Sequence, residues 1–172
     1  MTVSMYKVSV PIFVQFLTSL SACLDKAAAH AEAKQIDPAF LLSMRLYPDM
    51  YSLARQVQQA TNQAMRACSA LAGAEPLNMP NTETSIPELK ARIAKTIDYL
   101  KAFKPAQIDG SEDKEITIKL GNNERKFAGQ GLLLNHILPN FYFHCTTAYD
   151  ILRHCGIELG KRDFMGTPVN LQ

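Results

Sequence analysis

The sequence carries little surplus charge of either sign. Its 172 residues include 18 Lys and Arg against 16 Asp and Glu, which gives a formal net charge of +2, and the basic residues are scattered among acidic ones. Proteins that bind a phosphate backbone normally concentrate basic residues on one face. The sequence therefore argues against nucleic acid as a partner.

The motifs that identify common enzyme classes are also missing. The chain contains no G-x-S-x-G, Walker loop, dinucleotide fingerprint, H-E-x-x-H or C-x-x-C pair, so these enzyme classes have no support. The four cysteines, Cys23, Cys68, Cys145 and Cys155, lie far apart within apolar helical patterns. We therefore expect reduced, buried thiols in a cytoplasmic protein.

Glycine is scarce, with eight residues, whereas 47% of the residues are apolar and 20% are charged. This composition is typical of a globular protein and not of a disordered or fibrous one. A chain near this length buries roughly 70% of its unfolded surface when it folds as one unit. We therefore predict one domain over residues 1–172 with a sizeable core.

The apolar run from Val8 to Leu20 has two interpretations. It follows Lys7 and leads into Leu20-Ser21-Ala22-Cys23, which matches a bacterial lipoprotein signal. However, Pro11 and Gln15 interrupt the run, and its apolar spacing continues beyond Cys23 on one helical face. We therefore expect a core helix without export, and no apolar run long enough to span a membrane.

Apolar residues recur at helical spacing in four long segments. Ser85 and Glu88 have the S-x-x-E spacing of a capping box at the start of the third segment, and Pro139 is predicted to kink the fourth. The four helices are expected over residues 9–35, 48–73, 85–104 and 130–155, with a short helical stretch over 39–45.

A β-hairpin is predicted between the third and fourth helices. Apolar and polar residues alternate from Glu115 to Leu120, and Gly121-Asn122-Asn123 supplies turn residues before a second strand, Arg125 to Phe127. A lone hairpin is only marginally stable in water. We therefore expect it to rest on the helical bundle or on a second subunit.

The fourth helix concentrates polar groups on an apolar scaffold. Asn140 and His144 are one turn apart, and the pattern predicts that His144 points into the bundle. Two residues at this spacing can both bind one metal ion, although asparagine is a poor ligand for zinc or nickel. A core histidine hydrogen-bonded within the protein is the favoured interpretation, and a metal ligand is the alternative.

Two further polar residues are candidates for a site. Asp49, directly after Pro48, is predicted in the opening turn of the second helix, where free N–H groups stabilise a carboxylate, and capping is its favoured role. Tyr149 could supply a hydroxyl, although packing with a solvated tip is favoured for it.

Two blocks of the sequence resemble a known family. The blocks are Pro48-Asp49-Met50 with Leu53-Ala54-Arg55-Gln56-Val57, and Phe141-Tyr142-Phe143-His144 followed by Ala148-Tyr149, Ile151-Leu152-Arg153, Gly156 and Gly160-Lys161-Arg162-Asp163-Phe164. They look like the uncharacterised domain-of-unknown-function family numbered nineteen ninety-three, which is part of the DinB/YfiT-like superfamily. The resemblance covers nearly the whole chain.

This resemblance implies an all-α, four-helix up-down-down-up bundle with a long crossover, commonly packed as a homodimer. Superfamily members that bind metal use a histidine early in the second helix and an H-x-x-x-H pair on the fourth. His144 falls on the second histidine of that pair and Asn140 on the first, and Asp49 is the nearest polar candidate for the helix-two histidine. Only one of the three ligand positions thus holds its histidine.

We therefore expect a homodimeric helical-bundle protein in which a small polar pocket formed by His144, Asn140, Asp49 and Tyr149 binds a small molecule. One alternative is a divergent metal-dependent enzyme, hydrolase or thiol-transferase-like, that holds zinc or nickel with Asp49, Asn140 and His144 and activates a water molecule. The other is a non-catalytic interaction module that docks a partner through the hairpin or the Phe164-Met165 tail.

Overall fold

A computed structural model of the chain describes residues 3–120 and 123–168, and it is mostly helical with one two-stranded antiparallel sheet. The predicted helical class and the inserted hairpin are confirmed, and the predicted turn residues Gly121 and Asn122 lie outside the described residues. In chain order the elements are α1 (Val10–Lys34), α2 (Pro38–Ser43), α3 (Leu53–Ala72), α4 (Ile86–Ala102), α5 (Pro105–Ile108), β1 (Glu115–Leu120), β2 (Asn123–Ala128), α6 (Gly129–Leu132), the π-helical η1 (Leu133–Ile137), α7 (Leu138–His154) and α8 (Lys161–Met165).

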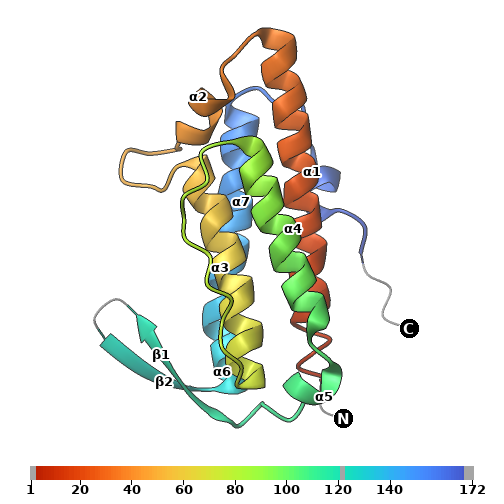
Figure 1. The fold of residues 1–172 in the computed structure, drawn as a ribbon, viewed down its shortest axis with the longest axis vertical. Coiled ribbons are helices and arrows are strands. Elements are labelled where there is room, and N and C mark those ends of the chain that lie inside the picture. Colours follow the sequence, from red (N-terminus) through yellow and green to blue (C-terminus); the bar gives the residue numbers. More distant parts are fainter. Residues whose placement is uncertain (1–2, 121–122, 169–172) are drawn as a thin grey trace.

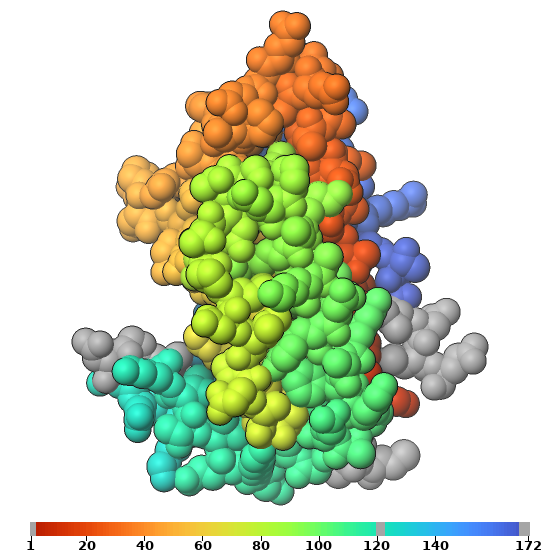
Figure 2. Space-filling model, viewed as in Figure 1, coloured from red at the N-terminus to blue at the C-terminus, as the bar shows by residue number. Residues whose placement is uncertain are grey.

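The four long helices lie side by side along the long axis of the molecule (Figure 1). α1 runs away from the end that holds the N-terminus, α3 and α4 both run back toward it, and α7 runs in the same direction as α1. The segment between α3 and α4, called the crossover below, runs along the outer side of α3 from one end of the helix to the other. The hairpin stands out from the lower end of the bundle, as the space-filling view also shows (Figure 2).

α1 supplies a large part of the hydrophobic core. Phe13, Leu17 and Leu24 on this helix are fully buried, and the Phe13 ring meets the edge of Phe141 from α7 at a centroid distance of 4.9 Å. By length and composition α1 could cross a membrane, which corrects the expectation that no apolar run reaches that length. Its apolar face packs inside the bundle instead.

α3 begins at Leu53, later than the predicted start at Pro48. The chain before it folds into a loop, which the Leu53 N–H closes by donating to the Met44 carbonyl at 2.8 Å. The Arg45 guanidinium donates to the Pro48 and Met50 carbonyls from inside this loop. These bonds satisfy backbone groups that the sequence assigns to a helix, and they leave Asp49 in the loop instead of in a helical turn.

A kink is predicted at Pro139, and the structure has a π-helical segment directly before this proline. Proline lacks an N–H, so the carbonyl of Asn135, four residues earlier, has no α-helical donor, and the preceding residues Leu133–Ile137 adopt the wider π-helix. The Asn140 side-chain amide donates to the His136 carbonyl at 2.6 Å. The helical axis therefore continues from α6 through η1 into α7.

The hairpin rests on the bundle of its own chain. Its register pairs Ile116 with Phe127 and Ile118 with Arg125, and both isoleucines are only 7% exposed. The Gly129 N–H at the start of α6 donates to the Lys114 carbonyl at 2.9 Å, which ties the hairpin base to the next helix.

A buried arginine, which the sequence did not predict, fixes the crossover between α3 and α4. Arg92 on α4 is 3% exposed. Its guanidinium donates to Thr61 Oγ1 at 2.7 Å and Asn62 Oδ1 at 2.6 Å on α3, and to the Pro80 carbonyl at 2.9 Å and the Glu83 carboxylate at 2.8 Å on the crossover. One side chain thus joins both helices to the segment between them.

We expect Arg92→Met to lower the free energy of unfolding by about 3 kcal/mol, because the change leaves buried acceptors without donors. Lys95→Met on the exposed side of the same helix is the matched control, with an expected change within about 0.5 kcal/mol. Urea unfolding measures both. A loss below about 1 kcal/mol for Arg92→Met would contradict the structural role of this network.

Candidate functional site

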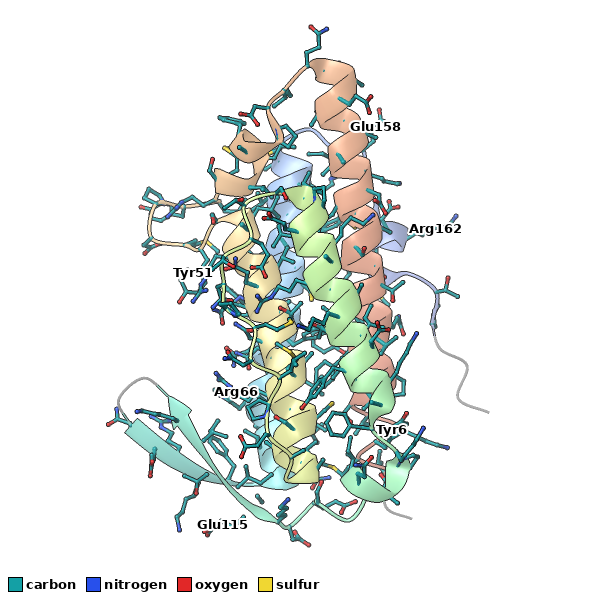
Figure 3. The ribbon with its side chains drawn as sticks, in the orientation of Figure 1. Tyr6, Tyr51, Arg66, Glu115, Glu158 and Arg162 are labelled. Carbon is teal, nitrogen blue, oxygen red and sulfur yellow. The ribbon has the colours of Figure 1, made fainter. Side chains whose placement is uncertain are left out.

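A small cavity opens where the loop before α3 meets the middle of α7. Its volume is about 230 Å³, somewhat below the roughly 300 Å³ at which drug-sized pockets begin. Tyr51, which precedes α3, lies toward the outer side of that helix (Figure 3). The residues that line the cavity are Asp49, Met50, Tyr51, Gln56, Phe143 and His144.

His144 is held in the cavity wall by Gln56. The imidazole is 8% exposed, and its Nδ1 lies 2.7 Å from Gln56 Oε1 on α3. Gln56, 1% exposed, uses its amide Nε2 to donate to the Tyr51 carbonyl at 3.2 Å. One glutamine therefore joins α7, α3 and the loop before α3.

These two bonds determine which imidazole nitrogen carries the proton. Because the Gln56 nitrogen already donates to a carbonyl, the Gln56 oxygen faces His144 as an acceptor. Nδ1 must then be the donor, and Nε2 of the neutral ring keeps its lone pair. The hydrogen bond to Gln56 thus holds the His144 ring in one tautomer, in which Nε2 is a hydrogen-bond acceptor.

Burial and the nearby positive charge of Arg55 keep the ring neutral. Burial is the larger cause, and the two together lower the pKa of His144 from its ordinary value of 6.5 to about 4. At neutral pH the imidazole is therefore uncharged and acts as an acceptor or a weak base.

Aromatic rings shape the rest of the wall. The Tyr51 ring stacks on the His144 imidazole at a centroid distance of 6.3 Å, and the Phe143 ring meets it edge-on at 5.5 Å. The Arg55 guanidinium lies 5.6 Å from the centre of the Tyr51 ring, in cation–π range. The cavity is thus an aromatic niche with the imidazole acceptor in its wall and the Asp49 carboxylate beside its opening.

The structure brings together only some of the predicted pocket residues. Asp49 and His144 line the same cavity, with Asp49 exposed beside its opening. Asn140 is not among the lining residues, and its amide donates to the His136 carbonyl. Tyr149 lies on another side of α7, where its ring packs against Phe164 at 5.6 Å.

The side chains do not fit the predicted zinc or nickel centre. Within residues 3–120 and 123–168, no three His, Cys, Asp or Glu side chains group closely enough to hold a metal ion. A catalytic zinc site normally has three protein ligands, whereas Asp49 and His144 share the cavity without Asn140. These side chains therefore do not support a metal-dependent reaction at this cavity.

The sequence does not predict Gln56 and Tyr51 as site residues, although both line the cavity. A signal for Gln56 existed, because it lies between Leu53 and Val57 in the buried stripe of α3, where a polar side chain needs a partner. Nothing comparable singles out Tyr51, since its position depends on the loop that Met44 and Leu53 close.

The lowered pKa of His144 makes stability depend on pH. The unfolded chain takes up the His144 proton near pH 6.5 and the folded chain only near pH 4, so stability falls as the pH drops through this window. We expect this residue to account for roughly 2 kcal/mol of lost stability between pH 7 and pH 4.5. Urea unfolding of wild type and His144→Gln at both pH values measures the difference, and equal losses in the two proteins would refute it.

Comparisons with known proteins agree with this architecture. The model of the family described as Domain of unknown function (DUF1993) matches residues 5–165. The crystal structure of a DinB family member protein from Shewanella denitrificans is similar, with 36% sequence identity, a TM-score of 0.87, and coverage of 97% of this chain and 94% of that chain. No curated protein matches. Since the family model spans nearly the entire sequence, the chain belongs to the DUF1993 family and has a DinB-like fold.

Proposed function

We propose that this protein binds a small, largely apolar molecule that carries one hydrogen-bond donor, such as a hydroxyl, in the cavity beside His144. In this proposal Nε2 of the imidazole accepts the donor, while Tyr51 and Phe143 contact the apolar part of the ligand. The observation that carries the proposal is the 2.7 Å hydrogen bond from His144 Nδ1 to Gln56, because it leaves the lone pair on the other nitrogen.

The cavity and its electrostatics support binding of a neutral ligand. His144 lines the cavity, which is open to solvent, so a donor that enters can form a hydrogen bond to the free ring nitrogen in place of water. The neutral imidazole also avoids attracting anions by charge. The open rim beside Asp49 leaves an entrance for the ligand.

The interaction-module alternative has less support from the contacts of its two segments. In the tail, Phe164 packs against Phe16 of α1 at 5.3 Å and Asp163 pairs with Lys26 at 2.7 Å. The isoleucines of the hairpin are buried against the bundle. Both segments thus serve the fold of their own chain.

Other features expected from the sequence stay part of this proposal. They are the up-down-down-up arrangement of the bundle, a homodimeric state, a cytoplasmic location and the absence of nucleic-acid and membrane partners. None of them is needed for the cavity beside His144 to bind a ligand.

The proposal is tested with two probes that differ in one donor, phenol and toluene. We expect phenol to shift the His144 ring signals in NMR spectra saturably and to bind roughly fivefold more tightly than toluene, because one neutral hydrogen bond contributes about 1 kcal/mol. His144→Phe should abolish this preference. Gln56→Leu should weaken it, because the tautomer is no longer fixed.

Tyr149→Phe is the matched control, since this tyrosine lies outside the cavity. It should bind phenol like the wild type. Equal binding of phenol and toluene by the wild type, or the same loss in Tyr149→Phe as in His144→Phe, would defeat the proposal. Stoichiometric zinc or nickel in protein purified without chelator would instead favour the metal-dependent alternative.

A further inference from the structure

Three basic residues from three elements lie in the region where the hairpin rests on the bundle. They are Arg66 on α3, Arg125 on β2 and His136 on η1. The cavity beside His144 includes none of them. His136 and His144 are eight residues apart, which corresponds to about 12 Å along a helix.

The register places Arg125 on the face of the hairpin that packs on the bundle, where its side chain is exposed to solvent. Arg125 pairs with Ile118 and Phe127 pairs with Ile116, and paired residues project from the same face of an antiparallel sheet. Because both isoleucines are buried, this face is the one that packs on the bundle. The Phe127 ring confirms the contact, since it lies 5.7 Å from the His136 imidazole.

Arg66 approaches the same place from α3, which packs against η1. Figure 3 shows Arg66 on the side of α3 above the hairpin. The pKa of His136 is lowered by burial and then by the charges of Arg66 and Arg125. Both charges thus disfavour a proton on the ring.

Neither arginine is neutralised within the part of the chain that the structure describes. Its ion pairs are Lys26 with Asp163, Lys90 with Asp25, Arg92 with Glu83 and Lys126 with Glu115. Across the same residues, 3–120 and 123–168, no side-chain hydrogen bond of Arg66, Arg125 or the His136 ring is formed. Two like charges that converge on a half-buried imidazole repel one another, and a bound anion would remove that cost.

We propose that Arg66, Arg125 and His136 form a binding site for a small dianionic oxyanion of the phosphate class, on the solvent-accessible surface where the hairpin meets the bundle. Each guanidinium offers a planar fork of donors that matches phosphate oxygens, and the neutral imidazole adds one N–H. Two positive charges favour a dianion over a monocarboxylate. The π-helical segment places His136 in this site, and such segments are frequent at functional sites.

The test is a titration of the full-length protein with sodium phosphate and, separately, sodium acetate at constant ionic strength. We expect phosphate to shift the His136 ring signals in NMR spectra saturably and to raise the thermal midpoint, and acetate to do so at least about tenfold more weakly. Arg66→Gln and Arg125→Gln should each weaken phosphate binding by about tenfold, the effect of one charge-assisted hydrogen bond. Arg125→Lys keeps the charge and should retain part of the binding.

Lys126→Gln is the matched control, because Lys126 neighbours Arg125 on the opposite face of β2 and pairs with Glu115 in solvent. It should bind phosphate like the wild type. The proposal is overturned if Lys126→Gln weakens binding as much as Arg125→Gln, if acetate binds as well as phosphate, or if the His136 signals do not respond. The phenol experiment reports on His144, so either site can fail without the other.

Discussion

The hydrogen bond between the Gln56 amide and the His144 imidazole is the interaction on which the candidate site depends. It joins α3 to α7 in the core, and both partners are almost fully buried. A buried histidine without this bond would leave a polar group unsatisfied, and its tautomer would be free to change. With the bond, burial keeps the ring neutral and one nitrogen remains available as an acceptor.

The fold prepares this bond through the loop before α3. The loop is closed between Met44 and Leu53 and braced by the Arg45 side chain, and it places the Tyr51 carbonyl where the Gln56 nitrogen can donate to it. The same loop brings the Tyr51 ring over the imidazole. The closed loop therefore sets both the orientation of the Gln56 amide and the position of the Tyr51 ring. A change in the loop would alter the hydrogen bond between Gln56 and His144.

The sequence predicts the helices well because their signals are local. Apolar spacing locates each long helix, α3 ends at the predicted position before a left-handed Gly73, and the predicted Ser85 capping box forms. The site is harder to predict because it depends on contacts between distant segments. Asn140 resembles a metal ligand by its spacing from His144, yet the π-helical segment occupies its amide. Arg92 has no local signal at all, since its acceptors lie on α3 and on the crossover.

The central claim concerns the proton on one imidazole, and NMR can locate that proton directly. A long-range ¹H–¹⁵N correlation spectrum at neutral pH distinguishes a protonated ring nitrogen from one that carries a lone pair. The structure predicts that His144 has its proton on Nδ1 and that Nε2 is unprotonated, with a change in this pattern in Gln56→Leu. A proton on Nε2 in the wild type, or a rapidly exchanging mixture of both tautomers, would contradict the account.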